Sequence, residues 1–380
     1  MKQDSDRNPT LDLIRALAAF TVVVHHARNL FFVDYHPGMS LFFKAFYFIS
    51  NLGPQAVMVF FVLSGYFVGG SVLRKMRSDR WRWRDYALDR LSRLWVVLIP
   101  ALVITCILDV MGMHFFGGKF YAGTEGNMLL QSPVSESLGA GNFVCNVFFL
   151  QTLMCPTFGS NGPLWSLANE FWYYIWFPAL LAVFFTKYRS KAACVLAILA
   201  IVSIVAFFHI FTGFILWCLG VVAYTLRVSE DGATATFMRR FEWPACLLFL
   251  ATLAASRLHL ANDFMIGTAF FVYLICLLQR KTSGVSGATA RWSINMSEQS
   301  YTLYLAHMPF IVFIMSGVWA RRLEPSFGNF AIYLGLVIVT YLYSFLLYFL
   351  FERRTGWVRA KAKSCTTLIA NAMPKASRIE

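Results

Sequence analysis

Charged side chains are scarce in this sequence. Only 14% of its 380 residues are Asp, Glu, Lys or Arg, whereas 58% are hydrophobic. A soluble fold could not bury that much apolar surface, so the composition excludes an ordinary water-soluble domain. Apolar runs of roughly 18 to 23 residues recur instead, and each is long enough to cross a hydrocarbon core of ~30 Å as a helix. The sequence therefore predicts an all-α, polytopic membrane helix bundle.

Acidic residues are fewer than basic ones, 19 against 33, and the net charge is +14. In a soluble protein this excess would favour a nucleic-acid partner, but here the basic residues are sorted by position, so we expect no nucleic acid. About ten transmembrane helices are expected, at residues 11–33, 52–73, 94–113, 163–185, 192–210, 213–227, 243–260, 264–279, 298–320 and 330–351. With these spans, most basic residues fall on the side of the membrane that carries both termini. The opposite side carries only Arg28, Lys44, Lys119, Arg257, Arg321 and Arg322, and Arg15 lies inside the first span. The positive-inside rule then places both termini in the cytoplasm.

Sequence motifs for metals and for common nucleophiles are lacking. The eight cysteines form no CxxC pair and no zinc spacing, so no metal is expected. There is no GxSxG elbow, no Walker A loop and no HxxxxD pair, which argues against an elbow-type hydrolase and a nucleotide-driven pump. No internal repeat is evident, which weakens the case for a transporter built from inverted halves.

One apolar segment, residues 143–158, is too short for a full crossing. Counting it as a crossing would put the basic stretch 187–191 on the wrong side of the membrane. We therefore predict a re-entrant or half-inserted segment over the extracytoplasmic mouth of a cavity. Cys145 and Cys155 fall in this segment, and an oxidising compartment would allow them to pair. The sequence leaves that disulfide open.

Ionisable residues inside the first span are its most informative feature. At 100° per residue, Asp12, Arg15 and His26 lie within roughly 60° of one another, and Arg15 and His26 are about 16 Å apart along the helix axis. Charged groups at the bilayer centre cost at least ~2.5 to 3.5 kcal/mol each, so this stripe is expected to face the bundle interior. The alternative is that Arg15 reaches lipid phosphate and that His26 merely donates to a backbone carbonyl.

Five sequence blocks resemble those of the acyltransferase-3 family and occur in the same order. Members of this family are membrane-bound O-acyltransferases of bacterial surface glycans. The five blocks are LDLIRALAAFTVVVHH at 11–26, FFVLSGYFVG at 60–69, WSLANEFWYYIWFP at 165–178, SYTLYLAHMPF at 300–310 and FER at 351–353. The resemblance spans nearly the whole chain. It implies a transmembrane domain over residues 1–352 and a basic cytoplasmic tail over 353–380, in the cytoplasmic (inner) membrane of a bacterium.

The resemblance also implies a reaction, the transfer of an acyl group, often acetyl, from cytoplasmic acyl-CoA to a hydroxyl. The acceptor would be an extracytoplasmic glycan or a lipid-linked saccharide, presented beside membrane lipid. The family's first-helix pattern, an Arg or Lys, ten intervening residues and a His, selects Arg15 and His26. We hypothesise that a neutral His26 is the general base on the acceptor hydroxyl. Arg15 would hold the CoA phosphates together with Arg90 and Arg93, which resemble the family's RxxR element.

Further candidates fall in the same blocks and their neighbourhood. Asp12 and Glu170 are added as catalytic candidates, Ser64 and Gly65 as residues beside the donor path, and Trp165, Ser166, Tyr304 and His307 as residues of the cavity. Some of the candidates have a plainer interpretation. It is a positive-inside anchor for Arg90 and Arg93 in residues 74–93, close helix packing for Ser64 and Gly65, a helix N-terminus for Glu170 and a structural histidine for His307. Phe171 and Trp172 depart from the family pattern, which often has an acid and a Gln there, so polar contacts to the acceptor are expected to differ.

Two other classes of function stay open at this point. A transporter or exporter would move a glycan or lipid without modifying it, and a non-catalytic relative would act as a membrane scaffold. The retained Arg15 and His26 argue against the scaffold. The sequence does not determine the acyl group, the acceptor, the oligomeric state or whether a separate extracytoplasmic partner completes the transfer.

Overall fold

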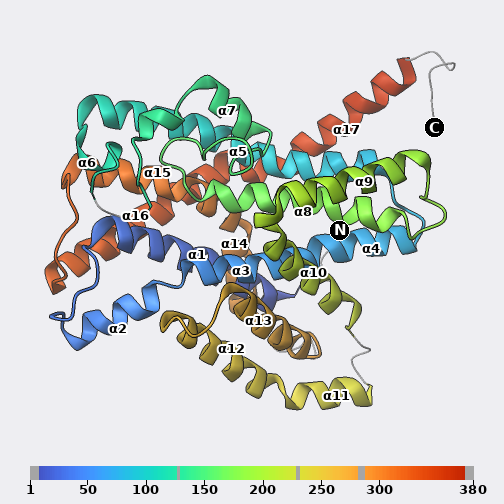
Figure 1. Ribbon diagram of the computed structural model, residues 1–380, viewed down its shortest axis with the longest axis horizontal. Coiled ribbons are helices and arrows are strands. Elements are labelled where there is room, and N and C mark those ends of the chain that lie inside the picture. Colours follow the sequence, from blue (N-terminus) through green and yellow to red (C-terminus); the bar gives the residue numbers. More distant parts are fainter. Residues whose placement is uncertain (1–7, 126–128, 228–231, 281–286, 373–380) are drawn as a thin grey trace.

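The computed structural model describes residues 8–125, 129–227, 232–280 and 287–372. Over these residues the regular secondary structure is helical, with only two isolated β-bridges, one from Phe32 to Leu323 and one from Gln151 to Cys155. Figure 1 shows most of the long helices running in roughly the same direction across the bundle. The all-α, multi-pass fold expected from the composition is confirmed.

The bundle consists of long apolar helices joined by shorter ones. In chain order the α-helices are α1 (Pro9–Phe31), α2 (Leu41–Ser50), α3 (Gly53–Ser64), α4 (Gly70–Arg77), α5 (Trp83–Phe115), α6 (Gly118–Tyr121), α7 (Ala140–Val147), α8 (Leu164–Ala182), α9 (Lys191–Ala206), α10 (Phe211–Thr225), α11 (Ala233–Arg240), α12 (Glu242–Arg257), α13 (Asp263–Leu277), α14 (Ala288–Glu298), α15 (Ser300–Val318), α16 (Phe327–Leu350) and α17 (Thr355–Ala372). A π-helical turn, η1 (Gly65–Gly69), joins α3 to α4, and 3₁₀ turns lie at η2 (Val134–Ser137), η3 (Phe208–Ile210) and η5 (Glu352–Arg354).

Each of the ten expected spans falls on a helix or on a run of consecutive helices. Among the described residues, six helical segments are long and apolar enough to cross a membrane: Pro9–Phe31, Leu41–Arg77, Trp83–Phe115, Phe208–Thr225, Ser300–Val318 and Phe327–Cys365. Helices α9 and α13 are apolar but shorter. The helices are therefore confirmed, whereas the count of ten crossings stays a prediction.

Helix α1 packs against α3, α14, α15 and α16, so it lies inside the bundle. Its start is fixed by Asn8, whose side-chain oxygen accepts the backbone N–H of Thr10 at 3.0 Å, and by Pro9, whose missing N–H costs nothing in the first turn. Its other end is fixed where Phe31 and Val33 exchange backbone hydrogen bonds with Leu323. The ionisable stripe of α1 is thus held against α14 and α15.

Helix α10 crosses α3 and η1 in direct backbone contact at two glycines. A Cβ atom on Gly65 would lie 1.7 Å from the carbonyl oxygen of Trp217, and a Cβ atom on Gly220 would lie 1.9 Å from that of Val62. Only glycine fits such a crossing. Close helix packing, the plainer of its two interpretations, therefore accounts for Gly65.

Residues 143–158 form no crossing helix, because α7 ends at Val147 and turns follow. A disulfide joins Cys145 to Cys155, so the pairing that the sequence left open is present. The residues just after the segment are anchored on α5, where the buried carboxylate of Asp109 accepts the backbone N–H of Ser160 at 2.8 Å and its hydroxyl at 2.7 Å. How deeply the segment enters the membrane stays a prediction.

The two described ends of the chain lie at the same end of the bundle. Asn8, before α1, and Gly356 and Arg359, in α17, line one hollow, and Figure 1 shows α17 projecting from this end. The first part of the expected tail is therefore a helix, and it is held on α5 by an ion pair between Lys363 and Asp89 at 2.9 Å. Residues 1–7 and 373–380, which complete the expected domain and tail, lie outside the described residues.

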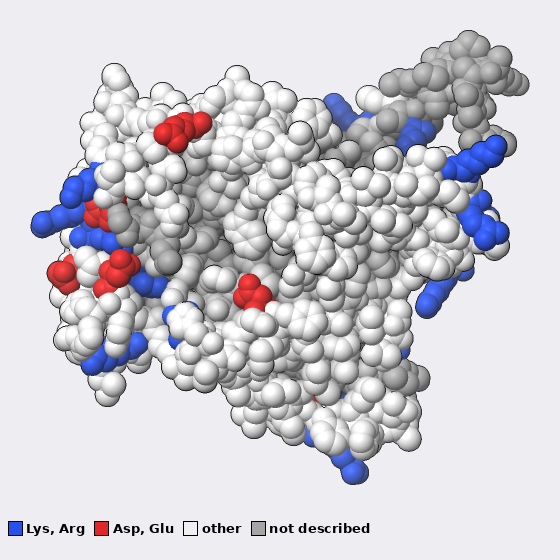
Figure 2. All heavy atoms as spheres, viewed as in Figure 1, with Lys and Arg blue, Asp and Glu red and all other residues white. Residues whose placement is uncertain are grey.

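Charged side chains gather towards the two ends of the bundle. Figure 2 shows an almost uncharged band across the middle of the visible face, with only basic side chains at the end near α17 and with both signs at the opposite end. An uncharged band between two charged ends is typical of a membrane-spanning bundle. The assignment of the α17 end to the cytoplasm stays a prediction.

Candidate active site

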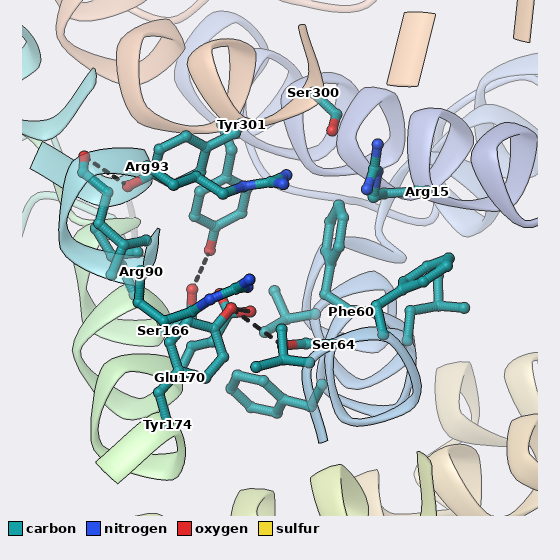
Figure 3. Close-up of a pocket in the computed structure, with 18 residues that line it drawn as sticks. Arg15, Phe60, Ser64, Arg90, Arg93, Ser166, Glu170, Tyr174, Ser300 and Tyr301 are labelled. Atoms are coloured by element: carbon teal, nitrogen blue, oxygen red, sulfur yellow. Dashed lines mark hydrogen bonds between the residues drawn. The ribbon is translucent and has the colours of Figure 1, made fainter. Parts of the chain in front are cut away.

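A cavity of about 290 Å³ opens between α1, α3, η1, α5, α8 and α15. Figure 3 shows its side chains converging from helices that are far apart in the sequence. Its polar lining consists of Arg15, Ser64, Arg90, Arg93, Ser166, Glu170, Tyr174, Ser300, Tyr301 and Tyr304. The remaining lining residues are apolar and come mostly from α3 and η1. The cavity therefore combines a polar wall with an apolar one, as suits an amphipathic ligand.

Three arginines direct their guanidinium groups into this cavity (Figure 3). Arg15 Nη2 donates to Asp12 Oδ1 at 3.3 Å and to the carbonyl oxygen of Ser297 at 3.2 Å, which fixes it near the start of α1. The Arg90 guanidinium lies 5.9 Å from the ring centroid of Tyr86 and 6.0 Å from that of Tyr174. Guanidinium groups in such a cluster match phosphate oxygens in charge and shape.

Glu170 is the carboxylate in the cavity wall. The hydroxyl of Tyr174, one turn later on α8, donates to Glu170 Oε1 at 2.5 Å. That hydroxyl also lies 3.3 Å from Ser64 Oγ, which in turn accepts the indole N–H of Trp217 at 3.1 Å. This series of hydrogen bonds holds the Glu170 carboxylate in one orientation and connects α8 to α3 and α10.

A second hollow, of about 520 Å³, lies beside the first at the end of the bundle where the chain ends meet. The two share Arg15, Phe67 and Arg93, so they are neighbouring parts of one recess. Its lining adds charged groups of both signs: Asp12, Glu298, Glu352, Arg353 and Arg359. Glu352, in the FER block, accepts the backbone N–H of Thr302 at 3.1 Å and its hydroxyl at 2.6 Å.

His26 faces α15, where it meets His307. His26 Nδ1 lies 2.7 Å from His307 Nε2, and His307 Nδ1 lies 2.9 Å from the carbonyl oxygen of Leu303. His307 is fully buried, whereas His26 is half-buried. Because a carbonyl oxygen only accepts, His307 Nδ1 carries a proton, and in a neutral His307 the Nε2 atom accepts the proton of His26 Nδ1. A neutral His26 then keeps a free lone pair on Nε2.

The structure brings together most, but not all, of the residues predicted from the sequence. Arg15, Ser64, Arg90, Arg93, Ser166, Glu170 and Tyr304 line the first cavity, and Asp12 lines the second. His26, His307, Gly65 and Trp165 lie outside both linings. His307 approaches the cavity through Tyr304, one turn earlier, whose hydroxyl lies 2.6 Å from Ser166 Oγ.

Three polar residues of the first cavity were not predicted from the sequence: Tyr174, Ser300 and Tyr301. All three lie inside the blocks quoted above, and Tyr174 follows Glu170 by four residues, which is the spacing of neighbours on a helix face. That spacing was a usable signal for Tyr174. Among the described residues, no group of three or more His, Cys, Asp or Glu side chains is arranged to hold a metal ion.

Curated proteins with similar sequences are acyltransferases. The chain is 27% identical to the putative peptidoglycan O-acetyltransferase YrhL of Bacillus subtilis over 205 residues, 52% of this chain and 27% of that protein. It is 31% identical to the acyltransferase MdmB of Streptomyces mycarofaciens over 176 residues, 45% of this chain and 38% of that protein. It is 26% identical to the peptidoglycan O-acetyltransferase OatA of Listeria monocytogenes over 185 residues, 46% of this chain and 24% of that protein.

These matches cover well under half of each relative's length, so they do not carry the relatives' whole activities to this chain. No solved structure matches the chain. The sequence pattern of a family described as an acyltransferase domain, in contrast, matches residues 8–349. That match includes every lining residue of the first cavity and the His26–His307 pair, whereas part of the second hollow, from Glu352 to Arg359, lies beyond it. On this near-complete match, the chain belongs to the acyltransferase-3 family of membrane acyltransferases.

Proposed function

We propose that this acyltransferase moves an acyl group, in the simplest case acetyl, from cytoplasmic acyl-CoA to a hydroxyl on the opposite side of the membrane. The acceptor would be a glycan or a lipid-linked saccharide outside the cytoplasmic membrane of a bacterium. The names of the relatives, two of which specify peptidoglycan O-acetylation, support this class of reaction. In this protein the acyl-CoA donor would bind at one end of the bundle, and the general base would lie further along α1.

The donor would bind in the recess that the two cavities form. Arg15, Arg90 and Arg93 supply positive charge for the CoA phosphates. The apolar wall formed by α3 and η1 would receive the pantetheine arm, which carries the thioester towards Tyr304 and His307. Ser166 and Glu170 line this path, and we assign them to orientation of the acceptor or the thioester.

His26 would act as the general base. Its Nε2 atom takes the proton of the acceptor hydroxyl while that oxygen bonds to the thioester carbonyl carbon. The carbon–sulfur bond then breaks, and the departing CoA sulfur receives the proton from the imidazolium. The products are an ester on the acceptor and free CoA, with neutral His26 restored.

The observation that carries this proposal is the hydrogen-bonded series His26, His307 and the Leu303 carbonyl. A histidine that only filled space in the core would need a hydrogen bond at one ring nitrogen, and either neutral tautomer would be acceptable. Here a fully buried partner would place the proton on His26 Nδ1 and leave Nε2 unprotonated. This is the state that a general base requires near pH 7.

Acyl-CoA with a labelled acyl group tests the reaction in inverted membrane vesicles. The proposal predicts that label appears on a saccharide inside the vesicles and that free CoA thiol appears outside in equal amount. A transporter or exporter would move the saccharide without consuming acyl-CoA. Labelled saccharide formed without release of CoA thiol would contradict the proposal.

A further inference from the structure

Helix α15 contains a buried proline beside the histidine that contacts His26. Pro309 lies inside α15, two residues after His307. Because a proline has no backbone N–H, Pro309 cannot donate to the Leu305 carbonyl, four residues earlier, and its ring pushes that carbonyl away from the helix. The freed carbonyl of a membrane-spanning helix needs a donor from a neighbouring segment. The break in the helical hydrogen bonds therefore falls on the turn that carries His307.

Asn161 supplies the missing donor. Its side-chain Nδ2 lies 2.8 Å from the Leu305 carbonyl oxygen and 3.2 Å from Thr105 Oγ1 on α5. The Thr105 hydroxyl itself donates to the Ala101 carbonyl at 2.7 Å, so both neighbours of Nδ2 act as acceptors. Asn161 and Thr105 are 0% and 1% exposed, so bulk water does not compete for the Leu305 carbonyl.

The loop that carries Asn161 is itself fixed in place. The preceding residue, Ser160, donates its backbone N–H and its hydroxyl to the Asp109 carboxylate on α5. Gly159 has a φ of +57°, and a Cβ atom there would lie 2.3 Å from Asp109 Oδ2, so only glycine lets the loop approach the carboxylate. The Asn161 carbonyl accepts the backbone N–H of Leu164, the first residue of α8, at 3.3 Å. The loop thus joins α5, α8 and α15.

We propose that Asn161 is a positioning residue for the acyl transfer. Its hydrogen bond to the Leu305 carbonyl fixes the turn of α15 that orients His307 towards His26. The distance of 2.7 Å between His307 Nε2 and His26 Nδ1 is that of a short hydrogen bond, and a displacement of the turn by about 1 Å would break it. The inference rests on the proposed function, in which His26 is the general base.

Pro309 makes the link between Asn161 and His307 testable. P309A restores a backbone N–H at residue 309, and the Leu305 carbonyl then has its α-helical partner within α15. Asn161 is no longer the donor on which the position of that turn depends. The effect of losing the Asn161 side chain is therefore expected to be smaller when Pro309 is also replaced.

Acyl transfer by the full chain in proteoliposomes is compared for the wild type, N161A, P309A and the double variant. We expect N161A to lower kcat roughly 10-fold, the effect of one lost hydrogen bond, and to leave the KM for acyl-CoA unchanged. With P309A present, N161A is expected to lower kcat by less than about 3-fold. N146A is the matched control, because Asn146 is equally buried and its hydrogen-bond partners lie within residues 142–158. Any loss in N146A is expected to persist with P309A.

A second measurement reads the histidine pair without turnover. The seven histidines are labelled with ¹⁵N, and H26Q and H307Q identify the signals of the pair in the NMR spectrum. We expect N161A to move the His307 Nε2 signal towards that of a ring nitrogen without a hydrogen bond, and P309A to reverse the change. A wild type that transfers no acyl group from acyl-CoA would contradict the proposed function, whereas these signals still decide the role of Asn161.

T105V keeps the test decisive if N161A fails to fold, because it removes only the second acceptor of the Asn161 amide. It is expected to move the His307 signal in the same direction by a smaller amount, and P309A again reverses the change. The inference is overturned if the folded variant leaves kcat and the His307 signals as in the wild type. It is equally overturned if P309A does not reduce the effect of that variant.

Discussion

A histidine that acts as a base needs an unprotonated ring nitrogen. The hydrogen-bond partner of the imidazole determines which of the two nitrogens is unprotonated. In this protein the partner of His26 is His307, whose own tautomer is set by the Leu303 carbonyl. In the proposed mechanism His307 would therefore be a positioning residue that does not touch the substrate. The substitution H307F keeps the ring volume but removes the acceptor, whereas H307Q can present an oxygen near the position of Nε2.

We expect H307F to lower the kcat of acyl transfer on the order of 100-fold, within the usual range for general-base catalysis, with little change in the KM for acyl-CoA. H307Q is expected to recover a large part of that loss. Steady-state kinetics in proteoliposomes measure both constants. Equal losses of kcat in H307F and H307Q would show that His307 contributes packing alone.

Arg90 belongs to a basic stretch that topology alone would explain, so its role needs a matched comparison. Arg90 lines the cavity beside Tyr174, whereas Arg84, six residues earlier on α5, is exposed and lies outside both linings. R90Q is expected to raise the KM for acyl-CoA about 10-fold, because a charge-assisted contact to phosphate is lost. R84Q is expected to leave that KM unchanged. An equal rise in the KM for acyl-CoA in both variants would indicate that the basic stretch acts only through its overall positive charge.

Among the helices, α10 packs against α3 and η1, which form the apolar wall of the cavity. A methyl group at position 65 would overlap the Trp217 carbonyl oxygen, which is backbone and cannot rotate away. We expect G65A to destabilise the protein by about 1 to 3 kcal/mol, the range for overpacking a close contact. G335A is the matched control, because a Cβ atom on Gly335 in α16 meets nothing within 4 Å. Thermal unfolding in detergent compares them, and an unfolding temperature of G65A equal to that of G335A would contradict this account.

The long helices were predictable from the sequence, because apolar length and the positions of Lys and Arg both follow from the physics of the bilayer. The expected span 52–73 is less regular than predicted, since it consists of α3, η1 and α4. Its π-helical turn packs against α10, a contact between segments far apart in the sequence that no local pattern encodes. The disulfide was left open for a similar reason: whether Cys145 and Cys155 approach each other depends on the fold of the turns between them.

Helical periodicity placed Arg15 and His26 on one stripe, but they do not line one cavity. Their separation of about 16 Å along α1 lets Arg15 reach the recess near the chain ends while His26 contacts α15. The partner of His26 could not be chosen from the sequence, because His307 is 281 residues away. The lining role of Tyr301 likewise depends on how α15 packs against α5.

The orientation of the whole molecule in the membrane follows from the proposed reaction, which requires the recess that would bind the donor to open to the cytoplasm. Cys365, in α17 near that recess, is a free and exposed thiol. We expect a membrane-impermeant maleimide to label it in inverted vesicles and not in intact cells. After mild reduction, Cys145 and Cys155 are expected to show the opposite pattern, and they serve as the internal control. Labelling of Cys365 in intact cells would reverse the proposed orientation.

The proposed chemistry as a whole depends on the imidazole of His26. Purified protein in proteoliposomes, supplied with labelled acyl-CoA on the donor side and a saccharide acceptor on the other, measures its contribution directly. We expect His26→Ala to lower the turnover of acyl transfer by roughly 100- to 10,000-fold, the contribution of a general base. The thermal stability and acyl-CoA binding of the variant are expected to stay near those of the wild type. Near-native turnover by His26→Ala would contradict the account.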